Sequence, residues 1–232
     1  MSSEGPPADG YSLGRVEAFS DGVIAVAITL LVLDLRVPRP TDGGSLAHQL
    51  GGLWPNYLAY VISFLAIGIM WLNHHAMLRR LRVVDHSVVV VNLLLLLCIV
   101  PLPFTTSLFA TYLDAPAGGR LAAAVYAGSF LVTAVVFLAL QCLVVLRRPA
   151  LLAEPLTPAR QRALLLRSSV AVPVYLLAAV LGVLSPYLTL AVCTAVGVFY
   201  LLPARLTGPR SPGRPPGRFG TDNSHGSTQG SP

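Results

Sequence analysis

Arg15-Val16-Glu17-Ala18-Phe19-Ser20-Asp21-Gly22 carries charged residues directly into the apolar run at residues 23–33. The run has the composition of a membrane-spanning helix, so the carboxylate of Asp21 is expected to lie within the span. An ionisable group at that depth is costly unless neighbouring helices or water supply partners. The sequence therefore predicts a functional or structural polar site around Asp21.

The composition identifies the chain as a membrane protein. Of its 232 residues, 54% are hydrophobic and only 11% are charged. A helix needs about 20 apolar residues to cross a bilayer, and continuous apolar runs satisfy their backbone in lipid as helices. We therefore predict an all-α integral membrane protein with six transmembrane helices. The six segments are 15–37, 55–78, 86–109, 120–146, 166–185 and 187–204.

The arginines predict the orientation of these helices in a cell membrane. The chain has no lysine, so all 16 of its cationic residues are arginine. With six spans, thirteen of these 16 fall on the side that holds both termini and the second and fourth loops. By the positive-inside rule both termini are cytoplasmic. This segregation by membrane side favours a lipid bilayer over a nucleic acid as the reason for the net charge of +6.

The termini differ in composition from the segments between them. Residues 1–14 are rich in Ser, Gly and Pro, and residues 206–232 are rich in Pro, Gly, Ser and Arg. Both are predicted to be disordered, and they flank a single six-helix domain at 15–205. The three cysteines, Cys98, Cys142 and Cys193, all fall in apolar segments and are predicted to be small buried hydrophobes.

The strongly polar residues within the spans share one depth. Ser20 and Asp21 lie one to two turns from the basic end of the first segment, and residues 71–75 lie at the same depth in the second. Hydrocarbon offers polar groups no partners, so these groups should bond to one another. The predicted network contains Ser20, Asp21, Trp71, Asn73, His74, His75 and Asn92.

Several roles are open for the two histidines. They can be hydrogen-bonding contacts between helices, or they can relay protons or sense pH, because histidine titrates near neutrality. A metal or haem site is disfavoured, because adjacent residues of a helix point about 100° apart. We therefore expect neither a metal nor a cofactor.

The first span also presents a regular stripe. With Gly22 at zero on a helical wheel of 100° per residue, four residues fall within about 40° of it, and Leu30 lies at about 80°. The four are Arg15, Val26, Thr29 and Leu33. Asp21 lies well away, near −100°. The geometry alone allows a packing seam between helices or a pore-lining face, since narrow hydrophobic constrictions can gate by dewetting.

Three motifs resemble one known family. Arg15-x-x-x-Phe19-Ser20-Asp21-Gly22 with Leu31-Val32-Leu33-Asp34, then Trp71-Leu72-Asn73-His74-His75, then Asn92 with Pro101-Leu102-Pro103-Phe104, occur in order. They resemble the first three helices of bacterial relatives of transmembrane protein 175, the lysosomal potassium channel family. The resemblance covers about residues 13–205.

The resemblance implies six helices per repeat and, for a one-repeat chain, a homotetramer. Four copies of the first helix would line the pore, constricted by Val26, Thr29, Leu30 and Leu33. The Ser20–Asp21 pair, together with Arg15 and Phe19 of the same motif, would fix that helix through Trp71 and the polar groups of its neighbours. The permeant ion would be K⁺.

We therefore expect a passive potassium-permeable cation channel and not an enzyme. The alternative is a proton-coupled secondary transporter that uses Asp21 and His74 or His75 as a relay. An intramembrane enzyme acting through either histidine would need a nucleophile or metal set that the sequence does not offer.

Overall fold

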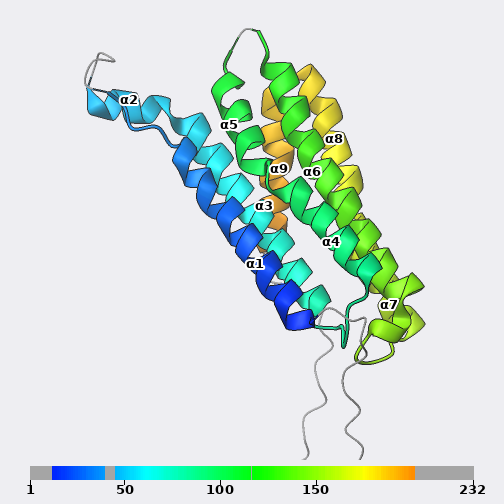
Figure 1. Ribbon diagram of the computed structural model, residues 1–232. Helices are drawn as coiled ribbons and strands as arrows, with labels where there is room; N and C mark the ends of the chain where they lie inside the picture. The colour runs from blue at the N-terminus through cyan, green and yellow to red at the C-terminus, as the bar shows by residue number, and fades with distance from the viewer. Residues whose placement is uncertain (1–11, 40–44, 116, 202–232) are drawn as a thin grey trace, which may run out of the picture. The chain divides into compact units, whose positions relative to one another are not determined.

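The computed structural model describes residues 12–39, 45–115 and 117–201, with side chains as far as Val196, and these residues are almost entirely helical (Figure 1). They form α1 (Leu13–Leu30), α2 (Leu46–Gly52), α3 (Trp54–Leu78), α4 (His86–Ile99), α5 (Leu102–Tyr112), α6 (Gly119–Cys142), α7 (Pro158–Ser169), α8 (Ala171–Leu184) and α9 (Pro186–Leu201). An isolated bridge pairs Leu81 with Leu152. The predicted all-α fold class is confirmed.

The helices reproduce the predicted spans in order. Five stretches are long and apolar enough to cross a membrane: Leu13–Asp34, Trp54–Leu78, His86–Tyr112, Gly119–Arg147 and Pro158–Leu184. A sixth, shorter apolar helix is described over Pro186–Val196. The first begins two residues before the predicted boundary at 15. The remaining parts of the two predicted disordered termini, 1–11 and 206–232, lie outside the described residues.

The third predicted span is not one helix but two. Proline has no backbone N–H, and Pro101 and Pro103 interrupt the ladder of hydrogen bonds between α4 and α5. Hydroxyl groups bond to carbonyls at this break. Thr133 Oγ1 lies 3.3 Å from Cys98 O and 2.8 Å from Ser129 O, and Thr106 Oγ1 donates to Leu102 O at 2.8 Å. Such side-chain bonds allow a broken helix to persist in a membrane.

Two predicted loops contain helices. Loop 38–54 holds α2, whose Ser45 caps it by accepting from His48 N at 3.3 Å. The long connection at 147–166 holds the first part of α7, which begins earlier than the span predicted at 166. Thr157 caps α7 and Pro158 occupies its first turn, a strong helix-start signal. Both capping signals are present in the sequence, outside the apolar runs that define the predicted spans.

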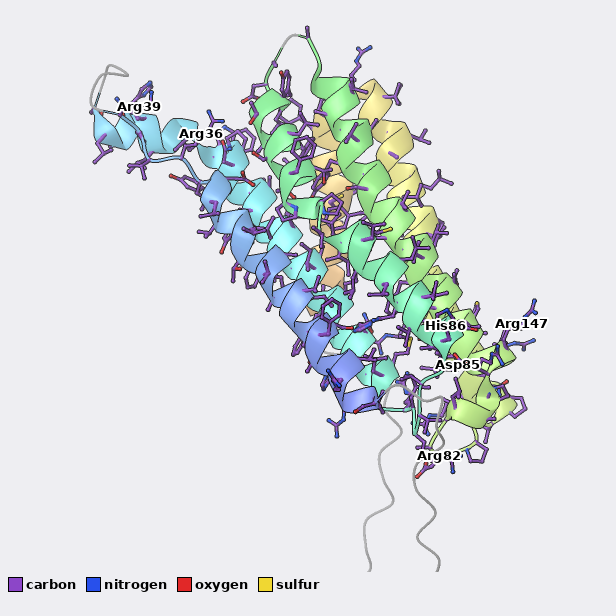
Figure 2. All side chains as sticks on the ribbon, in the orientation of Figure 1. Arg36, Arg39, Arg82, Asp85, His86 and Arg147 are labelled. Atoms are coloured by element: carbon purple, nitrogen blue, oxygen red, sulfur yellow. The ribbon has the colours of Figure 1, made fainter. Side chains whose placement is uncertain are left out.

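The arginine-bearing loops lie at opposite ends of the helices. Arg36 and Arg39 follow α1 at one end, whereas Arg82 and Arg147 lie at the other (Figure 2). At this second end, which we call the basic end, the α3–α4 turn pairs with the segment after α6. Arg82 N donates to Leu151 O at 2.8 Å, and Arg148 Nε lies 3.2 Å from Asp85 Oδ2. The arginines that the sequence assigns to opposite sides of the membrane therefore lie at opposite ends of the helices.

A stack of aromatic rings fills the core between α5, α6 and α8. Phe109 stacks on Tyr126 with ring centroids 4.7 Å apart, and Phe130 packs between Tyr126 and Tyr175. The Tyr126 hydroxyl lies 3.0 Å from Ser63 Oγ, and Thr106 Oγ1 lies 2.9 Å from the same Ser63 oxygen. This hydroxyl network was not predicted from the sequence.

Gly118 permits the turn into α6. Its φ of +92° is in the left-handed region, and a Cβ there would lie 2.9 Å from the Tyr112 ring. We expect Gly118→Ala to destabilise the protein by about 1–2 kcal/mol, seen as a lower thermal unfolding midpoint in detergent. Gly128→Ala is the matched control, because a Cβ at Gly128 meets nothing within 4 Å. Equal midpoints for the two variants would contradict the prediction.

Candidate functional site

Helix α1 has one buried face and one exposed face. Its buried side chains are Ser20, Ile24 and Ala27, followed by Leu31 in the 3-10 turn that continues the helix to Asp34. Their spacing of four, three and four residues places them on one side of a helix. That side packs against α3, α4 and α5. The opposite side of α1 is therefore turned away from the other described helices.

The stripe predicted from the sequence lies on this outward side. Val26 is 57% exposed, Leu30 40% and Leu33 73%, and Arg15, Gly22 and Thr29 are exposed with them. Thr29 Oγ1 donates to Val26 O at 2.9 Å, so its proton is committed to its own helix and its oxygen lone pairs remain available. Phe19 is 57% exposed. Arg15 and Phe19, predicted as network members, thus lie among the exposed residues of α1.

A buried chain of three hydrogen bonds joins α1, α4 and α3. Asn92 Nδ2 donates to Ser20 Oγ at 2.9 Å, and Ser20 Oγ in turn donates to Val16 O at 2.8 Å. Asn92 Oδ1 lies 2.7 Å from His74 Nε2. An amide that donates through its nitrogen accepts through its oxygen, so His74 Nε2 carries the proton. Ser20, His74 and Asn92 are all at most 1% exposed.

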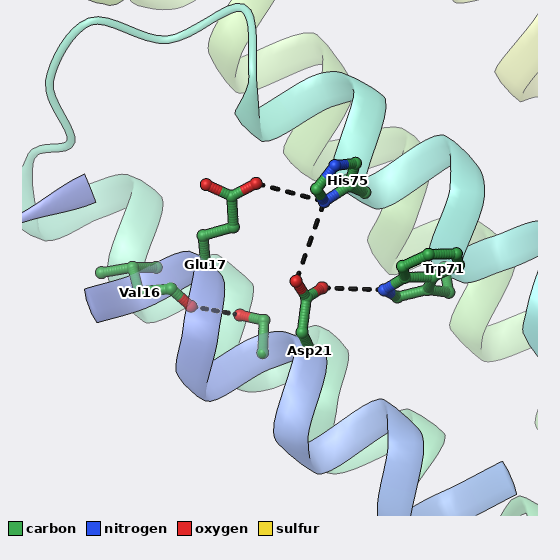
Figure 3. Close-up of polar contacts among 6 residues, drawn as sticks. Val16, Glu17, Asp21, Trp71 and His75 are labelled. Atoms are coloured by element: carbon green, nitrogen blue, oxygen red, sulfur yellow. Dashed lines mark hydrogen bonds and ion pairs between the residues drawn. The ribbon is translucent and has the colours of Figure 1, made fainter. Parts of the chain in front are cut away.

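A second, half-exposed branch joins α1 to α3 beside it (Figure 3). Trp71 Nε1 donates to Asp21 Oδ1 at 2.8 Å. His75 Nδ1 lies 3.1 Å from Glu17 Oε1 and 3.7 Å from Asp21 Oδ2. The Trp71 and His75 rings stack with centroids 5.6 Å apart. Both helices contribute residues spaced by four, so each pair lies on one face of its helix.

The two branches explain the pairs of adjacent polar residues. Neighbours in a helix diverge by about 100°, so Ser20 faces the buried branch while Asp21 faces the half-exposed one. The same divergence sends His74 to Asn92 and His75 to the carboxylates. Of the predicted network, Asn73 is placed differently: its Nδ2 donates to Ile69 O of its own helix at 2.9 Å.

Glu17 was missing from the predicted network. It lies in the quoted motif, four residues before Asp21 and therefore on the same face of α1. That spacing was the signal that could have identified it. With Glu17 included, the branch holds two carboxylates opposite one imidazole, and these three side chains are 25–33% exposed. Water can therefore reach this group.

The buried branch predicts unequal roles for two asparagines. Asn92→Ala should destabilise the protein by about 1–3 kcal/mol, because it leaves His74 Nε2 buried without an acceptor and removes the bond between α4 and Ser20 Oγ. Asn73→Ala should cost less, because its bond is to a carbonyl of its own helix. Thermal unfolding in detergent, followed by circular dichroism, measures both. A larger loss for Asn73→Ala would show that the buried branch does not anchor α1.

Comparison with known proteins places this arrangement in a family. The family model described as the endosomal/lysosomal potassium channel TMEM175 matches residues 15–103, which include α1, α3 and α4. A potassium channel from Streptomyces collinus is 49% identical over 127 residues, a match that spans 55% of this chain and 62% of that protein.

Other matches span most of the chain. A potassium channel from Chamaesiphon minutus is 39% identical over 191 residues, covering 82% of this chain and 93% of the relative. The fold also matches the crystal structure of a lysosomal potassium-selective channel TMEM175 homolog from that organism. The TM-score is 0.73 at 38% identity, over 81% of this chain and 95% of the other. The chain is therefore a multi-pass membrane protein that belongs to the TMEM175 family of ion channels.

Proposed function

We propose that this protein is a passive, potassium-permeable cation channel, in which the outward stripe of α1 from four copies lines a common pore. The observation that carries the proposal is the exposure of Val26, Thr29, Leu30 and Leu33 on a helix whose other face is fixed by polar bonds. We take K⁺ as the permeant ion because two relatives are named potassium channels. In this arrangement both termini are cytoplasmic and the protein lies in the cell membrane.

The stripe provides a constriction with little polar chemistry. Aliphatic rings from Val26, Leu30 and Leu33 would narrow the pore and raise a dewetting barrier to ions. Thr29 adds one ring of hydroxyl oxygens, whose lone pairs can face a cation because its proton is donated to Val26 O. The backbone carbonyls of α1 before its last turn are already hydrogen-bonded within the helix. Selectivity for K⁺ therefore rests on pore radius and dehydration cost and should be modest.

The polar branches would hold the pore helix in its rotational position. A rotation of α1 that removed Leu33 from the axis would also separate Ser20 from Asn92 and Asp21 from Trp71. Breaking the buried bonds leaves polar groups in a low-dielectric core, which is costly. In this proposal the network positions the pore without contacting the ion.

Reconstitution in planar bilayers with asymmetric K⁺ and Na⁺ tests the function. We expect step-like ohmic currents. Their reversal potential should lie nearer the equilibrium potential of K⁺ than that of Na⁺. Leu33→Ala should raise the single-channel conductance several-fold and lower the K⁺/Na⁺ permeability ratio, because the hydrophobic ring widens. Leu97→Ala is the matched control, because Leu97 is 68% exposed but lies on α4.

The same recordings separate the channel from a proton-coupled transporter. A transporter would use Asp21 and His74 or His75 as a relay, so Asp21→Asn would abolish coupled flux while Leu33→Ala left it unchanged. Saturable flux coupled to a proton gradient, with that pattern of variants, would contradict the channel proposal.

The number of copies has its own test. Light scattering of the purified protein should give the mass of four chains. A bifunctional thiol reagent should link Leu33→Cys chains in membranes, because Leu33 would meet its symmetry mates at the axis. Ile24→Cys is the control, since Ile24 is buried within the protomer. A mass of one or two chains, or no linkage at position 33, would rule out a tetramer built around α1.

A further inference from the structure

The half-exposed branch contains a group of donors that the channel proposal does not use. Glu17, Asp21 and His75 each offer a ligand atom, and these atoms all lie within 4.8 Å of one another. We propose that they form a binding site for a divalent transition-metal ion of the zinc class, joining α1 to α3. This inference is independent of the permeant ion and of the number of copies.

The donor atoms are already near the spacing that zinc requires. Zn–N and Zn–O bonds of about 2.0–2.2 Å in a tetrahedron place neighbouring ligand atoms about 3.4 Å apart. His75 Nδ1 lies 3.1 Å from Glu17 Oε1 and 3.7 Å from Asp21 Oδ2. Only small side-chain adjustments are therefore needed to receive an ion between them.

The imidazole nitrogen lacks a well-aligned partner. His75 Nδ1 is shielded from solvent, yet it makes no hydrogen bond of normal geometry despite its closeness to the two carboxylates. An unsatisfied nitrogen at such a position is unusual in a folded protein. An ion held by the three side chains would give this nitrogen a partner and neutralise the two carboxylates together.

Neighbouring groups orient the ligands, as in established metal sites. The free oxygen of Asp21, Oδ1, accepts from Trp71 Nε1 at 2.8 Å, and the Trp71 ring stacks on the His75 imidazole. Bonds of this kind to the far side of a ligand fix its direction and raise metal affinity. The three side chains are 25–33% exposed, so water can reach a fourth coordination position.

The donor set indicates the class of metal. One imidazole nitrogen with two carboxylate oxygens suits zinc and its neighbours, whereas Mg²⁺ and Ca²⁺ prefer six or more oxygen ligands. His74 and His75 are not placed to bind one metal together, because the two rings face different partners. The proposed site instead takes one histidine and two carboxylates from a different helix. Its effect would be to tighten the contact between the stripe-bearing helix and α3.

Co²⁺ is a direct probe of the site in metal-stripped protein in detergent. We expect a visible absorption spectrum of four-coordinate Co²⁺ that Zn²⁺ abolishes by competition. Glu17→Gln, Asp21→Asn and His75→Gln should each weaken Co²⁺ binding at least tenfold. Glu154→Gln and His48→Gln, at exposed positions outside the cluster, are the matched controls and should bind like the parent chain.

Trp71 supplies a second readout. The chain has two tryptophans, so Trp54→Phe leaves Trp71 as the sole fluorophore beside the site. Zn²⁺ should change its emission in a saturable manner, and Glu17→Gln should shift the midpoint to higher Zn²⁺ while leaving the metal-free melting curve unchanged. Absence of saturable Co²⁺ binding, or binding that all three ligand variants retain, would overturn the proposal. Both measurements are made without ion flux, so their outcome is separate from that of the bilayer recordings.

Discussion

The bond between Ser20 on α1 and Asn92 on α4 is the constraint on which the arrangement of α1 depends. It is buried, and it continues to His74 on α3, so one chain of bonds fixes three helices relative to one another. In hydrocarbon there is no water to replace a broken partner, so the polar groups hold the helices in one register. The apolar contacts of Ile24, Ala27 and Leu31 add area but little rotational specificity, because one aliphatic face packs much like another.

Fixing one face of α1 determines what the other face presents. The buried residues recur at helical spacing, and the opposite stripe consequently carries Gly22, Val26 and Leu33 outward. A large exposed aliphatic surface is ordinary against lipid and equally suited to contact with other copies. Membership of a channel family favours contact between copies as the proposed use of this surface. In that proposal, the polar network keeps the pore helix in its orientation, because the aliphatic side chains of the stripe are only weakly directional.

The half-exposed branch differs in character from the buried one. Glu17, Asp21 and His75 are near water at the basic end of the helices, and their charges are not fully matched within the group. The metal site that we propose would give this group a role beyond a structural contact between α1 and α3. The two branches thus divide the polar residues of α1 into those that hold the helix and those that can respond to the aqueous phase.

The sequence alone determined the fold class and the order of the spans, because these follow from apolar run length. Helical periodicity predicted the stripe, and the shared depth of the polar residues predicted most of the network, but the exposure of the stripe comes from the structure. The motifs around Asp21, Trp71 and Asn92 also sufficed to indicate the family. Only the tertiary structure decided which neighbours pair: that Glu17 joins Asp21 and His75, that Asn73 bonds to its own helix, and that the Thr133 hydroxyl of α6 reaches Cys98 O at the break before α5. Those pairings depend on the rotation and contact of separate helices, which depth and spacing along the chain do not specify.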